Sequence, residues 1–127
     1  MKDFLKFFIL TLSIWPFIVQ AITFKCLYAE GVGSSFFYSA ERYITIDPQK
    51  KTVNHGLGPK EYFEGSGSIA WRETVYLGDG FDNKVIGLNN FSRVTAELVV
   101  RQYRNEVTEQ NFAGQITYAC EKTELLF

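Results

Sequence analysis

The chain has 127 residues, of which 46% are hydrophobic and 17% aromatic, and its formal net charge at neutral pH is −1. A balance so close to neutral lacks the basic excess with which proteins follow a phosphate backbone. We therefore expect no nucleic-acid partner.

Residues 1–21 have the features of a secretory signal peptide. Two lysines precede an apolar run over residues 7–19, and the small residue Ala21 follows at the expected cleavage point. A membrane-spanning helix needs about 20 apolar residues, whereas this run is shorter and contains Pro16. The pattern predicts cleavage after Ala21, a secreted or periplasmic protein, and no stable membrane insertion after cleavage.

The mature chain, residues 22–127, is long enough for one domain. Its two cysteines are Cys26 and Cys120, and no other cysteine or histidine lies near either of them in the sequence. Two cysteines in an exported chain of this size predict a disulfide bond. Because the bond closes a loop of about 95 residues, the chain-entropy model assigns it somewhat over ~4 kcal/mol of stabilisation.

The cysteines end two similar segments, ITFKC at 22–26 and ITYAC at 116–120. In both segments every second residue is apolar or a cysteine, which is the pattern of a half-buried strand. A disulfide requires the Cα atoms of its cysteines to lie within about 6 Å of each other. We therefore expect the first and last strands to meet, so that the chain closes on itself.

Further strands are predicted by aromatic and β-branched residues between turn signals. They cover residues 36–39, 42–47, 51–54, 68–77, 84–91 and 96–104, with a short one at 61–63. Asp47-Pro48-Gln49-Lys50 is a favourable turn between the second and third of these. Ser68–Leu77 alternates most clearly, and Glu73 is the one polar residue on its apolar face.

Residues 96–104 are the one segment where a helix competes with a strand. Ala96, Glu97 and Leu98 are good helix formers, but Leu98-Val99-Val100 is β-prone and no clear helix stop follows. We favour a strand. Eight or nine short strands then predict a single all-β domain over residues 22–127, folded as an antiparallel β-barrel or β-sandwich.

The sequence shows no catalytic or cofactor-binding constellation. His55 is the only histidine, and Asn54-His55-Gly56 has the composition of a turn at the end of a strand. The serines of Gly65-Ser66-Gly67-Ser68 lack the strand-to-helix setting of a nucleophile elbow, and Gly31–Ser35 lacks the lysine and the helix of a phosphate-binding loop. We expect no enzymatic activity and no cofactor.

Three polar patterns favour surface positions over sites. Asp79 and Asp82 lack the spacing of a twelve-residue calcium loop, so no metal site is predicted, although the sequence leaves calcium binding by this loop open. Glu61 and Glu64 beside aromatic residues resemble the paired carboxylates of sugar-cleaving enzymes, but their separation in space decides that chemistry. Asn90-Phe91-Ser92 fits the N-glycosylation pattern, which matters only in a eukaryotic source.

The aromatic residues are the strongest indication of a binding function. Rings fill the cores of small β-domains, but a tyrosine near a strand end can be half-buried and still contact a partner. The candidate partner-binding residues are Tyr38, Tyr62, Trp71 and Tyr76. We therefore expect a non-enzymatic binding module for a protein or an envelope polymer. The alternative is a carrier that holds a small apolar ligand inside a β-barrel.

Overall fold

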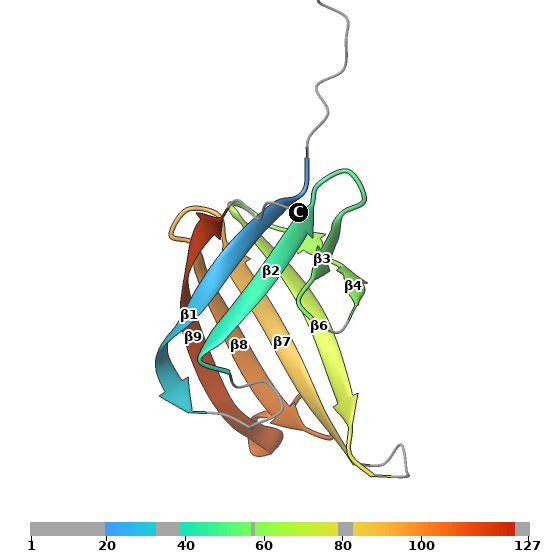
Figure 1. Ribbon diagram of the computed structural model, residues 1–127. Coiled ribbons are helices and arrows are strands. Elements are labelled where there is room, and N and C mark those ends of the chain that lie inside the picture. The colour runs from blue at the N-terminus through green and yellow to red at the C-terminus, as the bar shows by residue number, and fades with distance from the viewer. Residues whose placement is uncertain (1–19, 33–38, 57, 79–82, 124–127) are drawn as a thin grey trace, which may run out of the picture.

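The computed structural model describes residues 20–32, 39–56, 58–78 and 83–123. Within them, nine antiparallel strands form one sheet that curls into a nearly closed barrel (Figure 1). The strands are β1 (Ile22–Val32), β2 (Glu41–Asp47), β3 (Thr52–Asn54), β4 (Pro59–Glu61), β5 (Phe63–Glu64), β6 (Ser68–Tyr76), β7 (Lys84–Ser92), β8 (Glu97–Arg104) and β9 (Phe112–Thr123). Their order is β4-β3-β2-β1-β9-β8-β7-β6-β5, so the predicted all-β fold is confirmed and takes the barrel form.

Some sequence predictions fall outside the described residues. These are residues 1–19 of the predicted leader, most of the strand expected at 36–39, and Asp79 and Asp82 of the possible calcium loop.

The first and last strands pair as predicted. Cys26 on β1 lies directly opposite Cys120 on β9, their Cα atoms are 4.0 Å apart, and a disulfide bond joins them. The antiparallel ladder between β1 and β9 runs from Thr23 to Val32, with one irregularity after Tyr28. The disulfide bond therefore lies inside one of the two longest ladders of the sheet, where it holds the first and last strands in register.

The turn between β2 and β3 forms as its sequence predicts. The Asp47 carboxylate accepts hydrogen bonds from the backbone N–H groups of Gln49 and Lys50, at 3.1 and 3.2 Å. The backbone N–H groups of a turn have no partner on a neighbouring strand, and an aspartate side chain at the start of the turn accepts hydrogen bonds from them instead. The chain then returns as β3, which pairs with only the last three residues of β2, Thr45–Asp47.

Strand β8 resolves the competition between helix and strand at 96–104. It pairs with β7 on one side and β9 on the other. Leu98, Val100 and Gln102 alternate inward and are fully buried. A helix would have forfeited both ladders, so tertiary pairing outweighs the helix propensity of the Ala96-Glu97-Leu98 segment.

The barrel interior is filled by the inward-facing residues of the long strands. Apolar side chains occupy most of it, including Ile44, Ile69, Phe91, Leu98, Ile116 and Tyr118. Eight or nine strands enclose a space that such side chains can fill. The interior is therefore a packed core rather than a continuous channel.

The barrel has a seam between β2 and β6. On the side away from β1, β2 pairs with β3 only through Thr45–Asp47, and on the side away from β7, β6 pairs with β5 only through Ile69 and Ala70. Figure 1 shows the lower parts of β2 and β6 diverging, with β7 and β8 visible between them at the back of the barrel. In the described part of the chain, backbone hydrogen bonds do not join β2 to β6. Side chains link the two strands across this seam instead.

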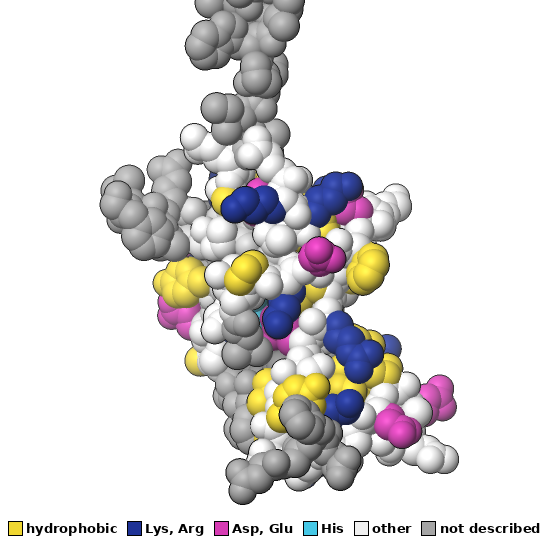
Figure 2. Space-filling view, turned by 90° about the vertical axis from the view of Figure 1, so that its right-hand side faces the viewer, with side chains coloured by type: hydrophobic (Ala, Val, Ile, Leu, Met, Phe, Trp, Pro, Cys, Tyr) yellow, Lys and Arg dark blue, Asp and Glu magenta, His cyan; other side chains and the backbone are white. Residues whose placement is uncertain are grey.

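The face on the side of β3, β4 and β6 carries side chains of every kind. Figure 2 shows Lys and Arg side chains spread over this face, with acidic and apolar side chains between them. The basic residues do not form one uninterrupted positive patch on it.

Candidate functional site

An apolar pocket of about 380 Å³ lies at the end of the barrel where β1 begins and where β2 and β7 end. It is lined by five apolar residues and two charged ones: Ile22, Phe24, Ile46, Pro48, Phe91, Glu64 and Arg93. Phe24 and Phe91 pack against each other with ring centroids 4.8 Å apart. The volume lies in the range of about 300–1,000 Å³ typical of small-molecule sites, which are largely apolar with a few polar groups.

The two charged residues of the pocket form an ion pair. Glu64 Oε1 lies 3.3 Å from Arg93 Nη2, and both side chains are a little under half exposed. The Tyr62 hydroxyl also donates to Glu64 Oε1, at 3.5 Å. Burial, followed by the charge of Glu64, raises the pKa of Tyr62 although Arg93 opposes this. The hydroxyl therefore stays protonated at neutral pH and remains a donor.

A backbone contact fixes Arg93 beside Glu64. The Arg93 N–H donates to the Gly67 carbonyl at 2.8 Å, which ties the turn after β7 to the turn between β5 and β6. Gly67 has φ +76°, a conformation that glycine adopts without strain. The geometry of this turn therefore helps to place a charged pair in the pocket wall.

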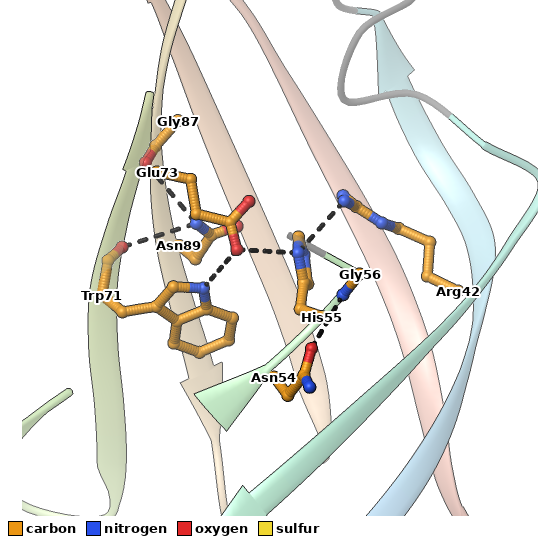
Figure 3. A network of polar contacts seen from close by, with 8 residues as sticks. All are labelled: Arg42, Asn54, His55, Gly56, Trp71, Glu73, Gly87 and Asn89. Atoms are coloured by element: carbon orange, nitrogen blue, oxygen red, sulfur yellow. Dashed lines mark hydrogen bonds and ion pairs between the residues drawn. The ribbon is translucent and has the colours of Figure 1, made fainter. Parts of the chain in front are cut away.

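A second polar group lies inside the barrel, around His55 and Glu73 (Figure 3). His55 Nδ1 lies 2.8 Å from Glu73 Oε1, and their side chains are 0% and 1% exposed. The indole N–H of Trp71 donates to the same carboxylate oxygen at 3.1 Å. Glu73 lies inside because β6 alternates, and position 73 is on the same face as Ile69 and Trp71.

The contacts of His55 indicate which of its ring nitrogens carries the proton that is donated to Glu73. Arg42 Nη2 lies 3.2 Å from His55 Nδ1, on which Glu73 also converges. A guanidinium only donates and a carboxylate only accepts, so one nitrogen cannot satisfy both. The shorter contact favours Nδ1–H donating to Glu73, while Arg42 acts through its charge and lies 5.7 Å from the ring centroid of Tyr118.

The surroundings of Glu73 favour its ionised form. Burial on its own raises the pKa of this carboxyl group. The hydrogen bond and charge of His55, the hydrogen bond from Trp71 and the charge of Arg42 act in the opposite direction and outweigh it. The pKa of Glu73 therefore lies below its ordinary value, and the group is a carboxylate at neutral pH.

The His55 network bridges the seam. Arg42 belongs to β2, Glu73 to β6, and His55 follows β3. Side-chain contacts therefore link the two strands where the backbone ladder does not. In the described residues, His55 Nε2, Glu73 Oε2 and Asn89 Oδ1 have no hydrogen-bond partner, and each such buried atom costs about 1–3 kcal/mol. Because His55 and Glu73 are buried, we interpret the network as structural.

The structure separates the candidate partner-binding residues. Trp71 is inside the barrel at 3% exposure, and Tyr62 is buried at 6% beside the pocket ion pair. Tyr76 is 51% exposed at the end of β6, and Tyr38 lies outside the described residues. Trp71 and Tyr76 thus do not share a surface, and the partner-binding role of the four residues stays a prediction.

Sequence reasoning missed both polar arrangements. It placed His55 in a turn at the end of a strand, which is confirmed because the residue directly follows β3, but it did not predict that the side chain is buried against Glu73. The available signal was Glu73, a charged residue on an otherwise apolar strand face, which required a buried partner. Glu64 and Arg93 are 29 positions apart, and nothing in their local sequence predicts that they meet.

Two further features are absent from the described residues. None of their helices is long and apolar enough to span a membrane. Nowhere among the same residues do three or more His, Cys, Asp or Glu side chains gather as a metal site would require.

Fold and site together define a small, disulfide-closed β-barrel domain with an apolar pocket at one end. Comparison with known proteins gave no family model, no curated protein and no solved structure that matches the chain.

Proposed function

We propose that this chain is an exported, non-enzymatic binding protein that holds the apolar part of a small ligand in the pocket at the end of the barrel. The observation that carries the proposal is the pocket of about 380 Å³ with five apolar lining residues. Burial of apolar ligand surface contributes about 25 cal/mol per Å². A pocket of this kind can therefore bind without any catalytic residue.

The packed interior supports a ligand at the barrel end rather than at its centre. Phe91, which is 1% exposed, and Phe24 form part of the pocket wall, and fully buried side chains fill the core. This refines the alternative of a ligand inside the barrel. Export is supported by the features of residues 1–21 and by the disulfide, which persists in oxidising compartments.

The experiment titrates the exported, oxidised protein with the uncharged fluorophore N-phenyl-1-naphthylamine. The test variant Ile22→Trp fills the pocket from its wall, whereas Val32→Trp adds the same side chain at the exposed, opposite end of β1. We expect one probe per wild-type chain, unchanged affinity in Val32→Trp, and at least tenfold weaker binding in Ile22→Trp. Absence of binding to the wild type, or equal affinity in all three proteins, would overturn the proposal.

A second candidate function is recognition of a protein or envelope polymer through exposed aromatic and apolar side chains. Tyr76, Phe63 and Val94 are 51%, 79% and 83% exposed, and exposed apolar groups are common in contact surfaces. The mixed charge of the face in Figure 2 supports a partner other than a polyanion. Purification from the native host separates the candidates, since a carrier brings a small molecule and a module brings a protein or polymer.

A further inference from the structure

We propose that the ligand of the end pocket is a single-chain amphiphile with a zwitterionic head group. This inference rests on the proposed function, because it concerns the same pocket. Its apolar chain would contact residues such as Phe24 and Ile46, and its two opposite charges would pair with Arg93 and Glu64.

The first argument is the position of the ion pair. Glu64 and Arg93 are part of the pocket lining itself, so a ligand that fills the pocket contacts both of them. An uncharged ligand would remove water from the pair without replacing the lost hydrogen bonds, which is unfavourable. The pocket therefore favours a ligand that supplies polar contacts of its own at this wall.

The second argument is the balance of charge. A ligand with one negative charge would pair with Arg93 but would face the Glu64 carboxylate, which lies 3.3 Å from the guanidinium. A ligand with one positive charge would pair with Glu64 but would face the Arg93 guanidinium. A head group that carries both charges pairs with both side chains and leaves no charge without a counter-charge.

The third argument is the low cost of opening the pair. The Glu64 and Arg93 side chains are 45% and 46% exposed, and exposed ion pairs of this kind contribute at most about 1 kcal/mol. The two groups can therefore exchange partners with a ligand without destabilising the barrel. Tyr62 donates to Glu64 from the protein side and helps to hold the carboxylate at the wall.

The experiment measures displacement of N-phenyl-1-naphthylamine from the full chain by four ligands with the same twelve-carbon chain, all below their micellar concentrations. They are dodecylphosphocholine, dodecanoate, dodecyltrimethylammonium and dodecanol. We expect dodecylphosphocholine to bind at least fivefold more tightly than each of the other three. Glu64→Gln should then shift the preference to dodecanoate and Arg93→Gln to dodecyltrimethylammonium. The exchanged pair Glu64→Arg with Arg93→Glu should keep the preference for the zwitterion.

The outcomes separate this inference from the proposed function. If the probe binds but the four ligands displace it equally, or the two single variants leave their order unchanged, the zwitterionic ligand is refuted while the apolar pocket stands. If the probe does not bind the wild type, the proposed function fails and this inference fails with it.

Discussion

Replacing Glu73 with leucine tests whether the His55 network closes the seam between β2 and β6. The substitution keeps a side chain of similar size on the inner face of β6. It removes the oxygen that lies 2.8 Å from His55 Nδ1 and 3.1 Å from the indole nitrogen of Trp71. Arg42 also loses the opposite charge that faces it across the imidazole.

The expected loss of unfolding free energy is about 3 kcal/mol. Two buried N–H donors, on His55 and Trp71, lose their acceptor, and each costs about 1–3 kcal/mol. Burial of the leucine side chain returns roughly 1.5 kcal/mol. The result agrees with the loss of about 3–5 kcal/mol when one partner of a buried ion pair is removed. Because small domains have about 5–15 kcal/mol of stability, we expect the variant to fold and to be measurable.

Urea unfolding of the oxidised protein, followed by Trp71 fluorescence, measures this loss. With a slope of about 2 kcal/mol per molar urea, the midpoint should fall by about 1.5 M. The matched control is Glu64→Leu, which breaks a half-exposed ion pair and should change the unfolding free energy by at most about 1 kcal/mol.

A double variant tests whether His55 and Glu73 act as a unit. His55→Phe combined with Glu73→Leu removes both partners, so it should be at least about 1 kcal/mol more stable than Glu73→Leu alone. If Glu73→Leu costs no more than Glu64→Leu, or if the double variant is less stable by the sum of two independent losses, the network does not act as a unit across the seam.

Three further predictions concern pH, the disulfide and the aromatic residues. The folded-state pKa of Glu73 lies below its ordinary value, so its contribution is complete above the unfolded value of roughly 4.3. It is lost as the pH falls through the folded value, and urea unfolding at a series of pH values should show the stability difference between the wild type and Glu73→Leu narrowing as the pH falls below the unfolded value. Replacing both Cys26 and Cys120 with alanine should lower the unfolding free energy by about 4 kcal/mol in the same assay; a loss below about 1 kcal/mol would contradict this. Trp71→Ala should lower the free energy of unfolding by about 3–5 kcal/mol and Tyr76→Ala by at most about 1 kcal/mol, as measured by thermal unfolding. Similar losses in the two variants would contradict the burial of Trp71.

Local sequence was sufficient for most strands. Ser68–Leu77 and residues 84–91 were predicted within one residue of β6 and β7, because alternation with a period of two determines both the strand and its buried face. The segment expected at 61–63 was less well placed, since Pro59–Glu61 and Phe63–Glu64 form two short strands on either side of Tyr62. Such short segments contain too few alternating positions to fix their boundaries.

The candidate site was much less predictable. The turn at His55 was predicted correctly, but its buried contact with Glu73 was not, and Glu73 was noticed only as an exception to a pattern. The tyrosines were grouped by residue type, but burial distinguishes Tyr62 from Tyr76. Residue type shows what a side chain can do, whereas the direction in which its strand faces decides whether a ligand can reach it.

Residue patterns alone predicted an all-β domain whose first and last strands are joined through Cys26 and Cys120. Both conclusions follow from local alternation and from the chemistry of two cysteines, which need no knowledge of strand order. The choice of a barrel over a sandwich, the end pocket, and the pairing of Glu73 with His55 and of Glu64 with Arg93 required the three-dimensional fold. These features depend on how the sheet curls, because curvature determines which distant residues meet.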